Sequence, residues 1–520
     1  MKRIVLLLQI LISLTVFVSA QTTVRVIPKP ISILEEKGVF TISSATNLAA
    51  PEVLKKRALQ LRNYIAPALG YDLTIISKPR GKNEIEFRVD KSLKNLGEEG
   101  YQLNVTPAKI ILSAFSEKGI FWGIQTIRQL LPEQIHRSSM VNGVAWELPC
   151  LSIEDNPRFK WRGLMLDCSR TFISKEEVKK YIEVLSFFKM NVLHMHLTDD
   201  QGWRIEIKKY PELTRIASRF HPSYNEPEEY QGFYSQEDMK EIIGFAADRN
   251  VEIVPEIEMP GHSYEVFAAL PQLSCKGDTA IIHPWTRGAG IHNEIFCAGK
   301  DQTFVFLENI LDEITTLFPS QYVHIGGDEA PKAHWKTCEK CQKRIKDLGL
   351  KDENELQSWF VKRIEKYLNS KGKKLIGWDE IMDGGLSKSA TVMYWRSWDK
   401  SVAQKIPSIE NDIVMTPTSH CYFDYTYEKI STEKMYAFNP VFNKNQPNDN
   451  KNILGVQANF WSHLDRTAPR IDRQLFPRLL ALAEVGWTQN DRKDWGDFKA
   501  RLDSKLKILD TMGIYYFGKN

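Results

Sequence analysis

The sequence predicts an α/β protein, a closed (β/α)₈ TIM barrel preceded by a small α+β domain. From about residue 158 onward, short apolar runs alternate with helical patterns, and eight such runs occur. Strands that alternate with helices indicate a parallel sheet, and eight repeats indicate a closed barrel. The expected strands lie within 161–169, 191–200, 251–262, 322–329, 374–380, 391–397, 413–424 and 453–461.

Residues 21–155 have a different pattern, which predicts the small α+β domain. The expected strands are 83–89, 100–105 and 109–115, and the expected helices are 52–68 and 117–131. Because this segment has no concentration of His, Asp and Glu, we expect it to support the barrel structurally. The predicted domains are therefore 21–155 and 156–520.

The helices expected between the barrel strands complete this pattern. Ser174 and Glu177 form a capping box that starts the first of them. The expected barrel helices are 175–189, 236–249, 303–317 and 354–370, with C-terminal helices at 474–485 and 496–511. Two longer connections, 200–235 and 263–300, are expected to cover the active face.

The first 20 residues predict a secretory signal peptide. Lys2 and Arg3 precede an apolar run that ends on Val18-Ser19-Ala20, a small-residue cleavage pattern. The alternative, an uncleaved membrane anchor, needs a longer apolar stretch, and no later segment approaches spanning length. We therefore expect a periplasmic or secreted protein with no membrane span after removal of the signal.

The charge balance excludes one class of partner. Removal of the signal peptide takes the formal net charge from +4 to +2. A near-neutral chain argues against a nucleic-acid partner, which requires a basic face. It suggests a neutral or weakly charged substrate.

Seven cysteines lie in the mature chain, too few for a disulfide scaffold. Cys275 and Cys297 flank a loop-like stretch, and a bridge between them stays open for an exported protein. Cys338 and Cys341, with His334 upstream, offer three potential ligands where a structural zinc requires four. We therefore expect a helical cysteine pair, free or bridged, without a metal.

The polar residues gather where the expected barrel strands end, which is where such barrels carry their chemistry. A single tryptophan there is more often core, and a single carboxylate often caps the next helix. Acids on several strands, an arginine and three tryptophans together suit a sugar, whose C–H faces stack on rings. These strand-end residues are Asp167, Arg170, Asp199, Asp200, Glu258, His262, Asp328, Glu329, Trp378, Asp379, Glu380, Trp395, Tyr422, Asp424 and Trp461.

A metal-dependent hydrolase is the competing interpretation. His194 and His196 lie on one strand face, as in metal-dependent barrel enzymes, and His262 is available. The eighth strand ends in Phe460-Trp461 and supplies no ligand of the kind that such a site requires. We expect the two histidines to hydrogen-bond within the barrel and the protein to need no metal and no other cofactor.

Seven motifs, in this order and spacing, resemble the family 20 glycoside hydrolases, the β-N-acetylhexosaminidases, over nearly the whole mature chain. They are RGLMLDCSRTF (162–172), HMHLTDDQGWR (194–204), EIEMPGH (256–262), HIGGDEAP (324–331), GWDE (377–380), YWR (394–396) and QANFW (457–461). The segment 119–131 also looks like part of the small domain that precedes this barrel. The resemblance implies a bacterial enzyme that removes terminal β-linked N-acetylglucosamine or N-acetylgalactosamine from a glycan.

The resemblance also implies a role for each matching residue. Glu329 matches the general acid, Asp328 the residue that holds the acetamido N–H, Arg170 a ligand of sugar hydroxyls and Tyr422 the partner of the acetamido oxygen. The walls of the site match Trp378, Trp395 and Trp461. The supporting network matches Asp199, Glu258 and His262, and Asp424 matches a contact to an outer hydroxyl.

The physical reading of Asp328 and Glu329 agrees with this resemblance. Ordinary retaining glycosidases place two carboxyls on opposite sides of the anomeric carbon, which consecutive residues cannot easily do. In substrate-assisted catalysis the acetamido oxygen of the sugar attacks instead, giving an oxazolinium intermediate and retained configuration. We then expect Asp328 to be ionised and Glu329 to be protonated.

One position departs from the family pattern. Many relatives carry a glutamate two positions after the last tryptophan, where this chain has His463. The preference between the two sugars is therefore open. Two alternatives also remain: a hexosaminidase that releases a disaccharide or accepts a sulfated sugar, and a non-catalytic glycan-binding protein.

Overall fold

The computed structural model describes residues 24–288, 290–442 and 450–519. The expected signal peptide, residues 1–20, lies outside the described residues. Within the described part, no helix combines the length and the apolar character that a bilayer crossing requires.

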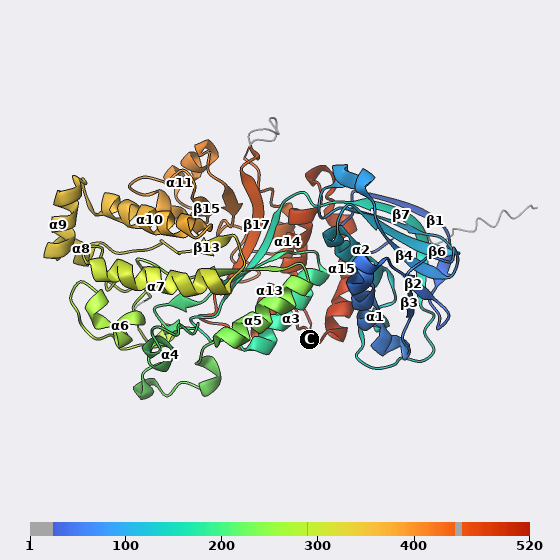
Figure 1. Ribbon diagram of the computed structural model, residues 1–520, viewed down its shortest axis with the longest axis horizontal. Helices are drawn as coiled ribbons and strands as arrows, with labels where there is room; N and C mark the ends of the chain where they lie inside the picture. The colour runs from blue at the N-terminus through green and yellow to red at the C-terminus, as the bar shows by residue number, and fades with distance from the viewer. Residues whose placement is uncertain (1–23, 289, 443–449, 520) are drawn as a thin grey trace, which may run out of the picture.

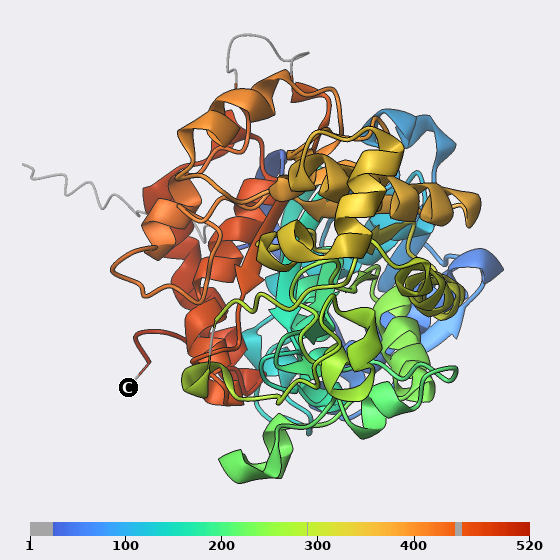
Figure 2. The ribbon, with the colours of Figure 1, turned by 90° about the vertical axis from the view of Figure 1, so that its left-hand side faces the viewer.

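Eight parallel strands close into a barrel, as predicted (Figures 1 and 2). Each strand pairs with the next in the chain, and the last pairs with the first, Gly455 lying opposite Trp161. Short apolar segments form these strands because both faces of each are buried. The strands are β8 (Trp161–Asp167), β9 (Val192–His196), β12 (Glu252–Glu256), β13 (Tyr322–His324), β14 (Lys374–Trp378), β15 (Thr391–Tyr394), β16 (Ile413–Met415) and β17 (Ile453–Phe460).

Helices surround the barrel as expected. The side chain of Ser174 accepts a hydrogen bond from the amide of Glu177 and starts the first helix. These helices are α3 (Lys175–Phe187), α5 (Gln236–Asp248), α7 (Asp301–Leu317), α10 (Glu353–Ser370), α11 (Lys400–Lys405), α12 (Thr432–Ala437) and α14 (Arg478–Trp487).

The single helix expected over 474–485 is wrong. The chain forms two helices there, α13 (Ala468–Leu475) and α14, separated by Phe476 and Pro477. Proline has no N–H to continue the helical hydrogen bonds, so the first helix ends before it. The other C-terminal helix, α15 (Trp495–Thr511), lies where the sequence placed it.

The N-terminal domain is a seven-stranded mixed sheet with helices on the face turned toward the barrel (Figure 1). Its helices α1 (Lys55–Leu69) and α2 (Glu117–Leu130) confirm the expected ones. In spatial order the strands are β1 (Ser32–Thr41), β7 (Glu147–Asp155), β5 (Tyr101–Val105), β6 (Lys109–Ala114), β4 (Glu84–Val89), β2 (Asn47–Ala49) and β3 (Thr74–Ile76).

Two ion pairs join this domain to the barrel, one part-buried and one fully buried. The Arg162 guanidinium, at the start of β8, lies 2.6 Å from the Glu99 carboxylate. The Lys189 ammonium, just after α3, lies 2.8 Å from Asp155, and both of these side chains are fully buried. Arg162 lies at the start of a barrel strand, and Lys189 lies between the end of a helix and the start of the next strand. The domain therefore contacts the N-terminal end of the barrel, opposite the C-terminal strand ends that carry the polar residues.

Candidate active site

Asp328 and Glu329, here called the acid pair, follow strand β13 after a tight glycine turn. Gly326 and Gly327 both have positive φ, at 65° and 90°, and Glu329 itself has φ of 41°. Positive φ is costly for a residue with a side chain, and such residues gather at functional sites. The turn therefore holds Glu329 in a backbone conformation that an isolated chain would avoid.

Gly326 is required for a second reason. A Cβ atom at this position would lie 1.6 Å from Oε2 of Glu258, inside the carboxyl group. Glu258 is fully buried, and neither of its carboxyl oxygens has a hydrogen-bond partner among the described residues. Gly326 thus makes room for a buried carboxyl next to the turn that carries the acid pair.

His262 connects the acid pair to a second pair of carboxylates. Its Nδ1 lies 3.2 Å from both Asp199 Oδ1 and Asp200 Oδ2. Its Nε2 lies 3.4 Å from Glu329 Oε2 and 3.7 Å from Asp328 Oδ2. Although burial lowers the pKa of His262, the surrounding carboxylates, Asp199 first, raise it well above its ordinary value. The imidazole is therefore a cation at neutral pH.

Arg170, three residues after the end of strand β8, continues this network. Its Nη2 lies 2.6 Å from Asp199 Oδ2, and its Nε donates to Gln201 at 3.1 Å. Burial alone raises the pKa of Asp199, but the positive charges of Arg170 and His262 outweigh it and hold the pKa far below the ordinary value. Asp199 is thus a fixed anion that orients two cations toward the site.

The members of the acid pair occupy different environments. The Asp328 side chain is buried, with 9% exposure, whereas the Glu329 side chain is 39% exposed. Burial raises the pKa of Asp328 to about 7; the charge of His262 opposes this shift and that of Glu329 adds to it. One oxygen, Oδ1, has no hydrogen-bond partner among the described residues. Asp328 therefore presents a desolvated acceptor that a bound N–H can satisfy.

The expected ionised state of Asp328 therefore depends on pH in the free protein. Burial disfavours its charge, so the carboxyl titrates in the neutral range instead of in the acidic range usual for aspartate. A donor that bonds to the carboxylate favours the charged form. Substrate binding is thus expected to complete the ionisation that the pocket alone leaves incomplete.

Aromatic rings form the wall of the site. Trp395 and Tyr422 lie nearly parallel, with centroids 6.0 Å apart, and Trp461 packs 5.9 Å from Trp378. Trp378 is buried, and its indole N–H donates to Glu256 at 2.8 Å. The Arg170 guanidinium lies 4.7 Å from the Trp461 ring. The three tryptophans and the tyrosine therefore come together as a single apolar surface.

Asp424 stands at the edge of this wall. It lies two residues after Tyr422, which forms an isolated parallel β-bridge with Asn459 of β17. Burial raises the pKa of Asp424 to about 7, and its Oδ1 has no hydrogen-bond partner in the described part of the chain. Like Asp328, it is an unsatisfied acceptor suited to a polar ligand.

One supporting residue, Glu256, was not among the residues selected from the sequence, whereas His196 was expected to hydrogen-bond within the barrel and Glu380 was one of the strand-end residues. Glu256 bonds to His196 and to Trp378. His196 Nε2 lies 2.8 Å from Asp199 Oδ2, which confirms that the strand histidines bond within the barrel. Glu380 accepts a 2.7 Å bond from the Trp395 indole. The alternating pattern of β9 identified the histidines, but nothing in the sequence identified Glu256 as their partner.

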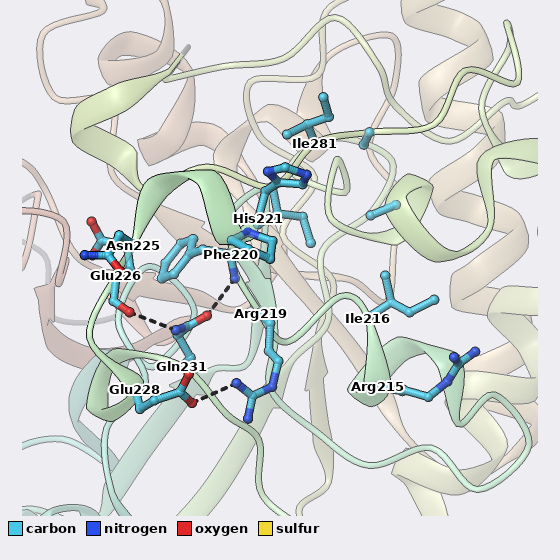
Figure 3. Close-up of a pocket in the computed structure, with 14 residues that line it drawn as sticks. Arg215, Ile216, Arg219, Phe220, His221, Asn225, Glu226, Glu228, Gln231 and Ile281 are labelled. Carbon is cyan, nitrogen blue, oxygen red and sulfur yellow. Dashed lines mark hydrogen bonds and ion pairs between the residues drawn. The ribbon is translucent and has the colours of Figure 1, made fainter.

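A separate cavity of about 590 Å³ lies between the loops at 215–231 and 268–282 (Figure 3). An Arg219–Glu228 ion pair of 2.7 Å forms part of its wall. The site residues expected from the sequence do not line this cavity. Glu226, which lines this cavity, forms a 2.7 Å ion pair with Arg466. Arg466 Nε in turn donates a 3.0 Å hydrogen bond to Oγ1 of Thr171, the residue that follows Arg170.

A parallel barrel whose strand tips carry an acid pair beside an aromatic wall defines a glycoside hydrolase. Residues 159–490 match the glycosyl hydrolase family 20 catalytic domain, and residues 23–156 match domain 2 of the same family. The chain therefore belongs to glycosyl hydrolase family 20, the family of the β-N-acetylhexosaminidases.

Individual relatives agree with this assignment. A beta-hexosaminidase of Porphyromonas gingivalis is 42% identical over 511 residues, which cover 95% of this chain and 64% of that relative. The chain thus spans less than two thirds of that protein. The GH20 beta-N-acetylhexosaminidase of Streptomyces coelicolor A3(2) has a TM-score of 0.84 at 29% identity, covering 95% of this chain and 98% of that one.

A second similar structure contains a ligand. A mutant Streptomyces plicatus beta-hexosaminidase in complex with product GlcNAc has a TM-score of 0.84 at 29% identity. It covers 95% of this chain and 97% of that chain.

Proposed function

We propose that this protein is an exo-acting, configuration-retaining β-N-acetylhexosaminidase that removes terminal N-acetylglucosamine or N-acetylgalactosamine from glycans by substrate-assisted catalysis. The observation that carries the proposal is the position of His262 between the Asp199–Asp200 pair and the Asp328–Glu329 pair, beside the aromatic wall. The GlcNAc complex of the S. plicatus relative supports the substrate class.

Each member of the acid pair has a distinct task in this mechanism. Asp328 accepts the acetamido N–H, so that the acetamido oxygen points at the anomeric carbon and attacks it. Glu329, which is more exposed, gives its proton to the glycosidic oxygen as that bond breaks, and later takes a proton from water. Tyr422 donates to the acetamido oxygen, and the tryptophans hold the acetamido group against the barrel.

Single substitutions in the acid pair test the mechanism. Glu329→Gln should lower kcat on an N-acetyl-β-glucosaminide by about 10²- to 10⁴-fold, because the proton donor is lost. The effect should be smaller with an aryl leaving group that needs no protonation. Asp328→Asn should lower kcat with both leaving groups, because participation of the acetamido group is lost.

A matched control is Glu237→Gln, which alters an exposed carboxylate paired with Lys240. It should retain the activity of the parent protein. Near-parental turnover by both acid-pair variants would contradict the proposal, and sugar binding without any turnover by the parent protein would favour a non-catalytic glycan-binding protein.

His463 is proposed to influence which sugar is preferred. Its ring lies 5.2 Å from Trp285, which in turn lies 5.5 Å from the Arg170 guanidinium. Burial and the charge of Arg170 lower the pKa of His463, so the ring is neutral. A neutral ring offers outer hydroxyls a weaker acceptor than a carboxylate does.

The substitution His463→Glu tests this role. It should change the ratio of kcat/KM between N-acetylglucosaminide and N-acetylgalactosaminide by about 10-fold, the size expected for a changed polar contact. The control Leu464→Glu, at a side chain that is 59% exposed, should leave the ratio unchanged. An unchanged ratio in both variants would exclude His463 as a determinant.

We also propose export to the periplasm or the medium, on the basis of the charged and apolar pattern of residues 1–20. Full-length expression followed by fractionation and N-terminal sequencing tests this. A mature chain that begins at Gln21 is expected, and an intact Met1 in the cytoplasmic fraction would contradict export.

A further inference from the structure

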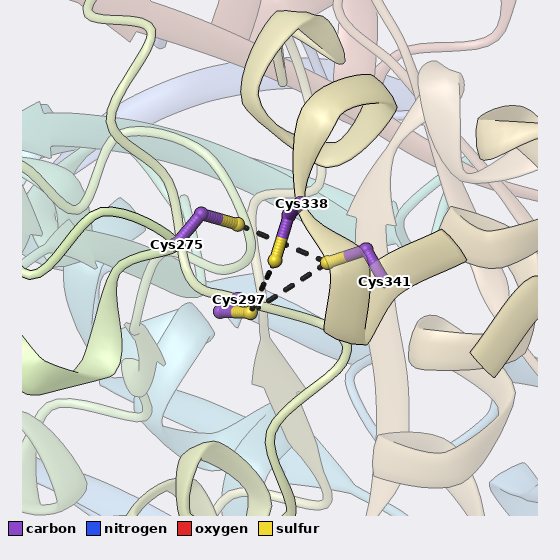
Figure 4. Close-up of side chains that lie close together, drawn as sticks. All are labelled: Cys275, Cys297, Cys338 and Cys341. Carbon is purple, nitrogen blue, oxygen red and sulfur yellow. Dashed lines mark hydrogen bonds between the residues drawn. The ribbon is translucent and has the colours of Figure 1, made fainter. Parts of the chain in front are cut away.

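Four cysteines from the connections that follow β12 and β13 lie close together (Figure 4). Cys275 and Cys297 belong to the long loop after β12. Cys338 and Cys341 belong to the start of α9 (Glu339–Leu348), in the connection after β13. His334, one of the three potential ligands considered in the sequence, is not part of this cluster; its Nε2 lies 3.9 Å from Glu294. The expectation of a cysteine pair without a metal is revised below.

The sulfur positions match a tetrahedron. The Sγ atoms are 3.8 Å apart between Cys275 and Cys341, 3.8 Å between Cys297 and Cys338, and 3.6 Å between Cys297 and Cys341. All four atoms lie within 4.8 Å of one another. Four sulfurs at about 2.3 Å from a central zinc ion are about 3.8 Å apart.

Disulfides do not fit the same positions. A disulfide requires sulfurs about 2.0 Å apart, and all seven cysteines, each of them described, are unbridged. The bridge between Cys275 and Cys297 that the sequence left open is therefore not formed. Cys297 and Cys341 each lie within 3.8 Å of two other sulfurs, which indicates four ligands around one metal ion and not two separate pairs.

We propose that Cys275, Cys297, Cys338 and Cys341 bind one structural Zn²⁺ ion as a Cys₄ site. Binding converts four thiols to thiolates, forms four Zn–S bonds and releases four protons to solvent. Four protein ligands fill the tetrahedron and leave no position for water or substrate, as in structural zinc sites. The ion therefore takes no part in glycoside hydrolysis, and the inference does not depend on the proposed function.

The local chain supports thiolate ligands. Cys338 and Cys341 have the C-x₂-C spacing of zinc sites, with Cys338 as the N-cap residue and Cys341 in the first turn of α9. A helix N-terminus lowers the cost of a thiolate. The Gly299 amide donates a hydrogen bond to Cys297, the kind of outer-shell contact that orients a metal ligand.

The site would clamp two loops that carry active-site residues. A Cβ at Gly299 would lie 2.4 Å from the Cys341 amide nitrogen, so the two loops pack backbone to backbone. The Trp335 indole donates to the Phe296 carbonyl at 2.9 Å, and the Phe296 amide donates to Pro260 at 3.0 Å. Pro260 is two residues from His262, so the clamp supports the segment that positions this histidine.

Metal analysis of the purified full chain tests the proposal. The full chain is expressed with its own N-terminus and purified without chelator. Inductively coupled plasma mass spectrometry should find about one zinc per chain. Exchange with Co²⁺ should produce the visible absorption of tetrahedral cobalt–thiolate coordination without unfolding the protein.

Substitutions locate the ion. The double variant Cys338→Ser/Cys341→Ser should lose at least 10-fold in bound zinc and should unfold at a lower temperature than the parent protein. The control Cys150→Ala removes a buried cysteine of the N-terminal domain and should retain one zinc. If the double variant does not fold, the zinc content and the cobalt spectrum of the parent protein still decide.

Three results would overturn the proposal. They are less than 0.1 zinc per chain in the parent protein, unchanged zinc in the folded double variant, and disulfide-linked peptides that join these cysteines in a non-reducing digest. The last result would show that the exported protein closes the cluster by oxidation instead of by metal binding.

Discussion

At the scale of single residues, two adjacent carboxyls differ because their surroundings differ. Asp328 is buried beside the fully buried Glu258, whereas Glu329 reaches solvent. Burial raises the pKa of Glu258 well above its ordinary value, and the charge of Asp328 adds to this shift. A protonated Glu258 spares Asp328 a second buried negative charge, which favours the ionised Asp328 that the mechanism requires.

The raised pKa of Asp328 predicts an acid limb in the pH profile. The proposed mechanism requires the carboxylate, and burial raises the pKa of this group to about 7. Its ionised fraction therefore falls as pH decreases through about 7, and kcat/KM should fall roughly 10-fold per pH unit below it, because kcat/KM reports the free enzyme.

The comparison of parent protein and Asp328→Asn checks this assignment. The residual activity of the variant should lack the limb near pH 7, since asparagine does not titrate. A limb that persists at the same pH in the variant would assign it to another group.

At the scale of elements, the turn after β13 carries the acid pair and permits Glu258 beneath it. Gly326 has φ of 65°, and any side chain there would enter the Glu258 carboxyl. The turn is therefore constrained both by its backbone and by its packing. Both the positive φ of Gly326 and its packing against Glu258 act on the conformation of the turn.

The substitution Gly326→Ala should reduce stability and activity together. We expect a loss of about 2–4 kcal/mol in the free energy of unfolding, since positive φ and overpacking both contribute. Gly349→Ala is a matched control, because Gly349 has φ of 64° but open space around its Cβ position. It should cost only about 1 kcal/mol. Equal losses in urea unfolding of the two variants would rule out the steric effect.

At the scale of the whole molecule, the N-terminal domain and the barrel share an interface that contains a fully buried ion pair. Lys189 and Asp155 are both fully buried, and Asp155 also accepts hydrogen bonds from Tyr101 and Trp487. Removing one partner of such a pair leaves an uncompensated charge, which costs much more than the pair itself contributes.

The substitution Lys189→Ala should therefore lower the free energy of unfolding by about 3–5 kcal/mol. The exposed pair of Lys240 and Glu237 gives the comparison, and Lys240→Ala should change stability by less than about 1 kcal/mol. Both values are measured by urea unfolding at pH 7. Similar losses in the free energy of unfolding for the two lysine variants would contradict the prediction that the buried Lys189–Asp155 pair matters more to stability than an exposed pair.

The fold class and most of the site were predictable from the sequence because their signals are local. Each barrel strand is a short apolar run, and each functional residue follows one of these runs. The helix break at Pro477 was missed because the apolar pattern continues through it. The partners of His196 and the contact between Gly326 and Glu258 were missed because they join different strands.

The apolar runs and motifs along the chain were enough to predict the barrel, the family and the candidate residues at its active face. The folded chain was needed to show that His262 lies between two carboxylate pairs, that Asp328 is buried while Glu329 is not, and that four cysteines lie close together. Periodicity and motifs report on neighbours along the chain. Burial, pKa and metal-ligand geometry depend instead on distances between segments far apart in the sequence, and these distances exist only when the barrel closes.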